Sequence, residues 1–255
     1  MEFASIGSGS EGNGTLIRRQ GGASLLVDCG FSAKEAIARM NNQGVVAEDL
    51  AGILVTHEHT DHIKGVARLA NKARVPVFTT WGTWIDKLAG VLDESLFKMI
   101  TPHEAFAIEE IEIQPIPVPH DANEPCQFTF SWAGKKLGVV TDTGCVTPHM
   151  VAMYQGCDSL MLECNHDLQM LANGPYPASL KRRVAGNLGH LNNQQAADML
   201  AQVQAGALQH LVITHISQKN NHPDLAMESL LQVENCCEST IRVAKQDSGF
   251  EWLTV

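Results

Sequence analysis

The sequence lacks any apolar stretch that approaches the length of a membrane span, and its first residues lack the charged and apolar segments of a secretory signal peptide. These absences argue against a membrane-spanning or secreted class and predict a cytoplasmic protein. Low-complexity segments, linkers and internal repeats are also lacking. With 255 residues, 44% of them hydrophobic, the chain can bury a sizeable core, and we expect one continuous domain over residues 1–255.

Cysteine pairs and an excess of positive charge are missing as well. The 7 cysteines are odd in number and include no Cys-x-x-Cys pair, so the sequence predicts neither a disulfide framework nor a zinc knuckle. The 18 basic residues against 28 acidic ones give a formal net charge of -10, which argues against a broad electrostatic binder of nucleic acid. A local basic cluster can still bind a few phosphates. The densest one is Lys181, Arg182 and Arg183, unless it is only a solvated face.

What the sequence does contain is a dense cluster of potential metal ligands. Residues 57–62 read His-Glu-His-Thr-Asp-His and follow the apolar run 52–56, which is short and β-branched and predicts a buried strand. Imidazole and carboxylate groups form a donor set suited to Zn²⁺, Mn²⁺ or Fe. A polar turn at a helix start would explain one Asp but not three histidines. His57 and His59 point the same way in an extended chain while Asp61 and His62 fall at the turn, so two neighbouring metal sites are expected.

Other apolar runs that we predict as strands also end at a residue able to bind metal. Runs 24–27, 111–119, 136–141, 159–162 and 211–214 lead to Asp28, His120, Asp142, Glu163 and His215, respectively. Strands that present polar residues at the same end place a site at one edge of a sheet. Helices are predicted at residues 33–43, 63–73, 82–90, 192–206 and 223–236.

These residues resemble the five motifs of the metallo-β-lactamase superfamily in order and type, over residues 28–215. The resemblance implies an α/β fold, the αββα sandwich, with the active site at one edge of its two sheets. It also implies two divalent metal ions, Zn or Mn, and an orienting role for Asp28 through hydrogen bonds. The implied ligands are His57, His59 and His120 for the first ion and Asp61, His62 and His215 for the second, with Asp142 bridging the two.

Further segments resemble the YycJ/WalJ-type bacterial nucleases, which are described as 5′-to-3′ exonucleases. They are residues 8–13, 120–121, 141–144, 163–167, 181–183, 189–193 and 215–221. One departure is Asn192, where the family often has Ser, and both residue types can cap a helix. The resemblance implies a nucleic-acid partner, in particular DNA ends, and leaves the oligomeric state open. The span from Asp142 to His215 is too short for the β-CASP insertion of related nucleases.

The implied reaction is phosphodiester hydrolysis by a metal-bridging hydroxide, because two cations lower the pKa of a shared water and clamp the phosphoryl oxygens. Asp61 belongs to this catalytic centre. His190 and His166 are candidates to protonate the leaving oxygen, the alternative for each being a hydrogen-bonded loop histidine. Asp121 and Asn165 are expected to fix imidazole tautomers.

Two segments are predicted to contact substrate phosphates. The Gly-rich loop 7–14 contains Ser8, Ser10 and Asn13 and suits a close approach of phosphate to backbone, although an ordinary hairpin turn would look the same. The basic residues 181–183 form the second segment. The leading hypothesis is a DNA phosphodiesterase, with DNA repair as its expected setting. A ribonuclease, a small cyclic-phosphate diesterase, a glyoxalase-II-like thioesterase and a metal-stabilised interaction module without turnover are the alternatives, and missing ligands would be the signature of the last.

Overall fold

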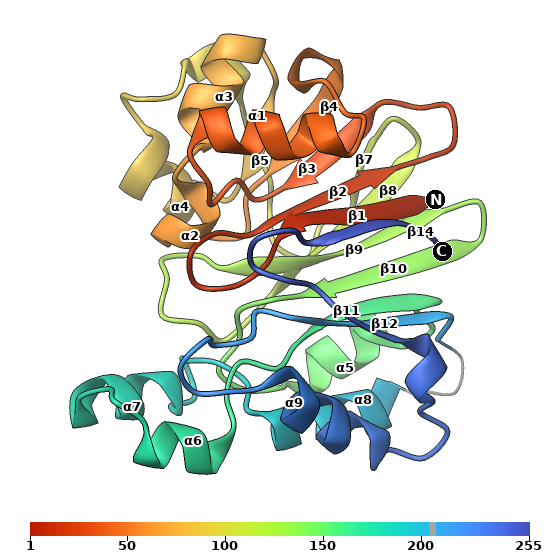
Figure 1. The fold of residues 1–255 in the computed structure, drawn as a ribbon. Coiled ribbons are helices and arrows are strands. Elements are labelled where there is room, and N and C mark those ends of the chain that lie inside the picture. The colour runs from red at the N-terminus through yellow and green to blue at the C-terminus, as the bar shows by residue number, and fades with distance from the viewer. Residues whose placement is uncertain (204–207) are drawn as a thin grey trace.

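Two sheets stacked face to face form the centre of the protein (Figure 1). The computed structural model describes residues 1–203 and 208–255, and within them each sheet has seven strands. Helices cover the outer surface of both sheets, so the layers follow the order helix, sheet, sheet, helix. The αββα sandwich predicted from the motifs is therefore confirmed.

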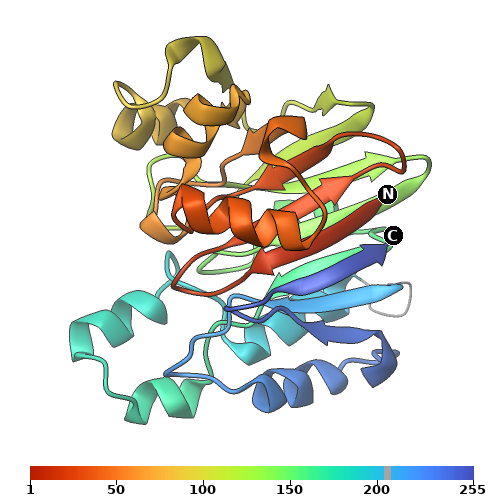
Figure 2. The same ribbon diagram turned by 45° about the horizontal axis from the view of Figure 1, so that its top comes forward.

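The first sheet has an antiparallel part and a parallel part. Its order is β14 (Phe250–Thr254), β1 (Glu2–Gly7), β2 (Gly14–Arg18), β3 (Ser24–Val27), β4 (Leu50–Leu54), β5 (Val77–Thr79) and β6 (Phe97–Met99). Neighbours from β14 to β3 run antiparallel, and neighbours from β3 to β6 run parallel. The C-terminal strand β14 thus returns to pair with the N-terminal strand β1, and Figure 2 shows the two ends of the chain close together.

The second sheet repeats this mixed organisation. Its order is β13 (Ile241–Val243), β12 (His210–Thr214), β11 (Ser159–Glu163), β10 (Lys135–Val140), β9 (Cys126–Trp132), β8 (Ile111–Pro117) and β7 (Phe106–Ile108). Here β10 to β13 are parallel and β7 to β10 antiparallel. The apolar runs that led to ligands in the sequence coincide with β3, β4, β8, β10, β11 and β12. The sequence did not predict β5, β6, β7, β9, β13 or β14.

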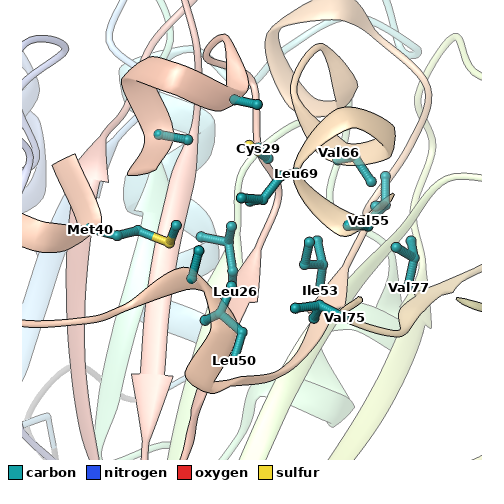
Figure 3. Packing of buried hydrophobic residues seen from close by; sticks show 14 of the residues in the cluster. Leu26, Cys29, Met40, Leu50, Ile53, Val55, Val66, Leu69, Val75 and Val77 are labelled. Atoms are coloured by element: carbon teal, nitrogen blue, oxygen red, sulfur yellow. The ribbon is translucent and has the colours of Figure 1, made fainter. Parts of the chain in front are cut away.

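The core consists of three apolar layers, one between the sheets and one beneath each helical layer. Successive residues of a strand enter different layers, because side chains alternate between the faces of a sheet. In β3, Leu25 and Val27 pack between the sheets, whereas Leu26 packs beneath α1 (Ala33–Asn42) and α3 (Val66–Ala73), as Figure 3 shows. Each fully buried side chain of this size contributes roughly 1.5–3 kcal/mol. This double-sided burial fixes the register of the strands that end at the site.

The predicted helix over residues 63–73 is wrong in its start and its continuity. The chain forms α2 (Thr60–Ile63) and then α3, with a break at Gly65. The Gly65 amide donates to the Cys29 carbonyl at 2.8 Å, and a Cβ on residue 65 would lie 2.4 Å from the Phe31 carbonyl oxygen. Only glycine allows this approach, and the break leaves α2 as a short turn that ends the ligand signature.

Other helices differ from the prediction mainly at their ends. Residues 82–90 become α4 (Trp81–Thr83) and a π-helix η2 (Trp84–Leu88), and α9 (Pro223–Leu231) stops five residues before the predicted end. Helix α8 (Asn193–Val203) fits the helix predicted at residues 192–206. The last three residues of that prediction, 204–206, lie outside the described part of the chain. The sequence missed α5 (Pro148–Tyr154), α6 (Leu168–Asn173) and α7 (Ala178–Val184). Short 3₁₀ turns lie at Ala47–Asp49, Glu94–Leu96 and Glu238–Thr240.

One edge of the sandwich carries α2 and α7, and both chain ends lie at the opposite end (Figure 1). The carboxyl ends of the parallel strands β3, β4, β10, β11 and β12 point toward the edge with α2 and α7. Ligand sites in sheets of this kind form outside the carboxyl ends of the strands. Among residues 1–203 and 208–255, no helix is long and apolar enough to cross a bilayer.

Candidate metal centre

All seven predicted ligands lie together at this edge. The signature 57–62 follows β4, and His59 is the residue that precedes the first turn of α2. The other ligands follow strands of the second sheet. His120 comes after β8, Asp142 after β10 and His215 after β12. Ligand atoms within 4.8 Å of one another form three groups: His57, His59 and His120; Asp61, His62, Asp142 and His215; and Asp142, Glu163, His190 and His215.

In the first group, ring nitrogens that carry no proton face one another. The Nδ1–H of His120 donates to the Gly189 carbonyl at 2.9 Å, and the Nε2–H of His59 donates to the Asp121 carbonyl at 3.2 Å. The remaining nitrogens, His120 Nε2 and His59 Nδ1, lie 3.1 Å apart. Burial lowers the pKa of His120, which keeps its ring neutral. Two lone pairs at this distance repel each other, so the arrangement fits a cation that both nitrogens can bind.

His57 supplies the third nitrogen of this group. Its Nδ1–H donates to Thr56 Oγ1 at 3.0 Å, since the Thr56 hydroxyl gives its own proton to Asp28 Oδ2 at 2.8 Å. The other ring nitrogen, Nε2, is buried and has no hydrogen-bond partner among the described residues. A buried nitrogen without a partner is costly unless a ligand satisfies it. The donor set therefore fits the metal implied by the sequence.

The second group is built around Asp142, which is 1% exposed. Its Oδ2 lies 2.6 Å from His62 Nε2 and 3.4 Å from His57 Nε2, and its Oδ1 lies 2.6 Å from His215 Nδ1. Asp61 Oδ2 lies 3.4 Å from His215 Nε2. Asp142 therefore reaches ligands of both groups, as a bridging carboxylate must.

Charge in the second group is balanced by protons on imidazoles. Burial opposes ionisation of Asp142, but His215 and His62 outweigh it and hold the pKa of this carboxyl well below its usual value. For His62 and His215, burial is likewise outweighed by the neighbouring carboxylates, led by Asp142, and the pKa of each imidazole rises well above its usual value. Metal ions bind deprotonated ligands and displace such protons. A divalent cation can take the place of these two protons without leaving an unbalanced buried charge.

Asp28 lies behind the signature and orients it. Its Oδ1 accepts from the Thr56 amide at 2.9 Å, and its Oδ2 accepts from Thr56 Oγ1 and, at 2.7 Å, from His62 Nδ1–H. The proton on Nδ1 leaves His62 Nε2 available for metal. Residue 28 also has a left-handed φ of 61° directly after β3, a conformation that Asp tolerates better than most residues.

Glu163 is a site residue whose role the sequence did not reveal. It ends β11, is fully buried and accepts from the Thr143 and Leu191 amides at 3.1 and 3.2 Å. Its Oε1 lies 2.7 Å from His190 Nδ1 and 3.1 Å from His215 Nδ1. Burial lowers the pKa of His190, but the carboxylates of Glu163 and Asp142 outweigh it and raise this pKa to about 9. The two carboxylates therefore favour the protonated form of the His190 imidazole.

A family model described as "Beta-lactamase superfamily domain" matches residues 24–216, which include all seven ligands. The chain belongs to the β-lactamase superfamily. The resemblance drawn from the motifs is confirmed. Among solved superfamily-fold structures, the metallo-β-lactamase fold protein YhfI from Bacillus subtilis superposes with a TM-score of 0.77, at 19% identity and over 99% of both chains.

Two curated relatives extend the similarity beyond the superfamily level. The exodeoxyribonuclease YycJ of Bacillus anthracis is 36% identical over 235 residues, which cover 91% of this chain and 89% of that protein. The exodeoxyribonuclease WalJ of Streptococcus pneumoniae is 32% identical over 230 residues, which cover 89% of this chain and 85% of that protein. The expected similarity to YycJ/WalJ-type nucleases is thus confirmed.

The superfamily site of this chain opens into a pocket of about 330 Å³. His59, Asp61, Asp142, His190 and His215 contribute to its lining. One wall comes from α7 and the segment before it, through Tyr176, Leu180, Arg183 and Val184. The ligands are thus open to a substrate beside α7, a helix that the sequence had not predicted.

The three basic residues 181–183 do not act as one patch. Successive residues of a helix point about 100° apart, since one turn takes 3.6 residues. Arg183 lines the pocket, and its Nε donates to Asp121 Oδ2 at 2.5 Å. Lys181 Nζ donates to the Ala172 carbonyl at 2.6 Å, and Arg182 is exposed. Of the three, the structure brings only Arg183 to the site.

Asp121, Asn165 and His166 differ in how they meet the ligands. The Asp121 carbonyl contacts the His59 ring, while its carboxylate pairs with Arg183. Asn165 Nδ2 donates to the His215 carbonyl at 3.2 Å, so it positions the backbone of a ligand and not its ring. His166 is fully buried, is absent from the pocket lining, and neither of its ring nitrogens has a hydrogen-bond partner among the described residues.

The Gly-rich loop connects β1 to β2 beside the metal centre. Ser8 is buried, and its hydroxyl accepts from the His215 amide at 2.9 Å. Asn13 is also buried, and its Nδ2 lies 3.2 Å from the Asp61 carbonyl and 3.1 Å from His62 Nε2. Ser10 is exposed and lines the pocket. Of the three, only Ser10 lines the pocket, while the other two contact the segments that carry ligands.

Proposed function

We propose that this protein is a metal-dependent exodeoxyribonuclease that removes nucleotides from the 5′ end of DNA. The observation that carries the proposal is the pair of ligand groups, both in contact with Asp142, beneath a pocket that also contains Arg183 and His190. Phosphodiester hydrolysis needs a cationic centre for the phosphoryl oxygens, a positive side chain for the substrate and a proton donor for the leaving oxygen. The two relatives named as exodeoxyribonucleases support DNA as the substrate.

The residues that would bind the metal ions are those of the two ligand groups. His57, His59 and His120 would bind one ion, Asp61, His62 and His215 the other, and Asp142 both. When bound, two divalent ions such as Zn²⁺ or Mn²⁺ lower the pKa of a water molecule and neutralise the charge of the phosphoryl oxygens. A ligand set of histidine nitrogens and aspartate carboxylates suits either ion.

His190 is the proton donor in this proposal. Its Nδ1–H is fixed on Glu163 at 2.7 Å, and its side chain is 21% exposed and lines the pocket. The carboxylates around it favour the protonated ring, and in this form the ring has a proton on Nε2 for the leaving oxygen. Glu163 acts as a positioning residue, because its carboxylate fixes the orientation and the charge of the His190 ring. The carboxylate is itself held by hydrogen bonds from the Thr143 and Leu191 amides.

In this proposal, Arg183 and Ser10, which both line the pocket, contact the phosphates next to the scissile one. Two nitrogens of Arg183 bind the Asp121 carboxylate, at 2.5 and 3.2 Å, which fixes the guanidinium at the pocket wall. A fixed guanidinium loses less conformational entropy when it binds an oxyanion. Tyr176 in the same wall offers an aromatic face to a base.

The test compares nucleic acids and label positions. Purified protein loaded with Zn²⁺ or Mn²⁺ should release mononucleotides in order from the labelled 5′ end of single- or double-stranded DNA. RNA, cyclic nucleotides and thioesters should be cut far more slowly. Metal analysis should approach two equivalents per chain and fall in Asp142→Ala. Preference for RNA, for a cyclic nucleotide or for a thioester would refute the DNA assignment, and one equivalent that Asp142→Ala leaves unchanged would refute the shared carboxylate.

A further inference from the structure

Four of the 18 basic residues of the chain gather in one groove beside α3. The groove measures about 700 Å³, and Lys64, Arg68 and Lys72 line one side of it while Lys87 of η2 lines the other. Its remaining lining is apolar apart from Asn71 and includes no carboxylate. On a chain with a net charge of -10, such a surface is the exception.

Lys64, Arg68 and Lys72 form a stripe, and we use "basic stripe" for these three residues. Arg68 and Lys72 lie four residues apart on α3 and share one face of that helix. Lys64, directly after α2, lines the same groove. All three side chains are exposed, and none forms an ion pair within the part of the chain that the structure describes. Like charges at this spacing destabilise a helix. An anionic ligand that binds along the stripe would remove this repulsion.

The groove is continuous with the metal site. Lys64 lines both the groove and a neighbouring hollow of about 790 Å³. Ser10, Thr60 and Asp61 line that hollow and also the metal pocket. The hollow itself has mixed charge, with Glu11 and Asp247 in its lining and Arg39 already paired with Glu35. Beyond the hollow, on the side of α2, the basic stripe therefore offers a DNA strand the first group of basic side chains without ion pairs in the described part of the chain.

We propose that the basic stripe binds the DNA backbone leaving the metal site on the side of α2. This inference rests on the exodeoxyribonuclease assignment and extends it to the path of the substrate. Arg68 and Lys72 are separated by about 6 Å along the axis of α3, since each residue adds about 1.5 Å, and Lys64 extends the stripe toward α2. One strand of DNA carries a phosphate about every 3.4 Å along its axis, so the stripe can follow three phosphates. Arg183, from α7 in the opposite helical layer, contacts the strand on the other side of the edge (Figure 1).

The test measures how binding depends on salt. The metal-loaded protein is titrated with single-stranded DNA whose phosphorothioate linkages resist cleavage, between about 50 and 200 mM salt. Each lost phosphate contact reduces the slope of log affinity against log salt by about 0.7. The triple variant Lys64→Gln, Arg68→Gln and Lys72→Gln should therefore have a slope smaller by about 2. Over this fourfold change in salt, the wild type should lose about 20-fold more affinity than the variant.

A matched control replaces two lysines and one arginine elsewhere on the surface. Lys34, Lys98 and Arg242 are exposed and line neither the groove, the hollow nor the metal pocket. Their triple Gln variant should keep the wild-type slope, although it loses the same net charge. A second variant, Lys64→Arg, Arg68→Lys and Lys72→Arg, keeps the charges and should keep the slope, which separates charge from folding.

Substrate length gives an independent readout. A dinucleotide has a single phosphodiester and cannot reach the stripe, whereas a 20-nucleotide DNA can. In the stripe variant, the ratio of KM for the long DNA to KM for the dinucleotide should rise about tenfold at low salt, with kcat for the long DNA unchanged. If the stripe variant has the same salt slope and the same KM ratio as the control variant, the proposal that the stripe binds DNA is overturned. A wild-type protein that neither binds nor cuts DNA would instead refute the exodeoxyribonuclease assignment.

Discussion

Replacing Asp28 with Asn tests how the metal ligands are oriented. Asn has nearly the shape of Asp and tolerates the left-handed φ of 61° at residue 28, so the backbone is expected to stay in place. The change removes the charge and turns one acceptor oxygen into an NH₂ donor. The Nδ1–H of His62, now 2.7 Å from a carboxylate oxygen, would face a weaker acceptor or a second donor. Its proton is then free to move to Nε2, the nitrogen that must bind metal.

The magnitude follows from the two ligands that depend on this carboxylate. His62 contacts it directly, and His57 contacts it through the Thr56 hydroxyl, at 2.8 and 3.0 Å. Removing such a partner typically reduces metal affinity about 10- to 100-fold, which corresponds to about 1.4–2.7 kcal/mol. His57 and His62 belong to different ligand groups, so Asp28→Asn should weaken both metal sites by this factor. Thr56→Val leaves the 2.7 Å contact between Asp28 and His62 and removes only the longer contact of Thr56 Oγ1 with His62 Nδ1, at 3.3 Å. It should therefore weaken the site of His57 more than the site of His62.

Competition with a chromophoric chelator can separate two binding constants in each variant. Thermal unfolding of the metal-free proteins serves as the control. It should show that Asp28→Asn is still folded at the temperature at which its metal affinity is measured. Wild-type affinity at both sites in Asp28→Asn would contradict the orienting role. Equal weakening of both sites by Thr56→Val would contradict the separate paths to the two histidines.

Three further predictions concern the reaction and its substrate. His190→Ala should keep two metal equivalents per chain and lose about 10²- to 10⁴-fold in kcat, the range of a lost acid catalyst, and unchanged turnover would return His190 to a structural role. In Glu163→Gln, burial of His190 is no longer outweighed by two carboxylates, so its pKa of about 9 should fall. The rate requires the protonated ring and decreases as pH rises through this pKa, so the falling limb of the pH profile should move to lower pH; an unmoved limb would refute the pairing. Arg183→Gln should raise KM for DNA about 10- to 100-fold, as for the loss of a charge-assisted hydrogen bond, whereas Lys181→Gln, whose ammonium faces the Ala172 carbonyl, should change it less than twofold. Equal effects of these two substitutions would contradict the separation of the basic cluster.

The strands that end at the site could be predicted because their side chains are buried on both faces. Leu25, Leu26 and Val27 are all apolar, and the next residue, Asp28, is polar, which marks the carboxyl end of a strand. The same pattern located β4, β10, β11 and β12 and the ligands that follow them. Short strands with half-exposed faces, such as β6 and β7, lack this pattern and form because a neighbouring strand offers hydrogen bonds. Their positions depend on the tertiary structure.

Roles within the site were less accessible from the sequence. Glu163 ends β11 and Asp142 follows β10, and only the packing shows that Asp142 contacts histidines of both ligand groups while Glu163 contacts His190 and His215. Neighbours in sequence also proved to be poor guides to a shared surface. Lys181 and Arg183 lie on different sides of α7. Lys64, Arg68 and Lys72 line one groove, although in the sequence they look dispersed.

The pairing of β14 with β1 has a consequence for the order of events during synthesis. Glu2 to Gly7 leave the ribosome before the other described strands, but their outer hydrogen-bonding edge is covered only when Phe250 to Thr254 follow, roughly 240 residues later. At about 5–20 residues per second, this interval is on the order of 10–50 seconds. During that time β1 presents an open edge to other nascent chains. Folding of this protein is therefore expected to depend on translation speed and on chaperones that shield strand edges, and a slowed C-terminal segment should increase aggregation before it affects the finished enzyme.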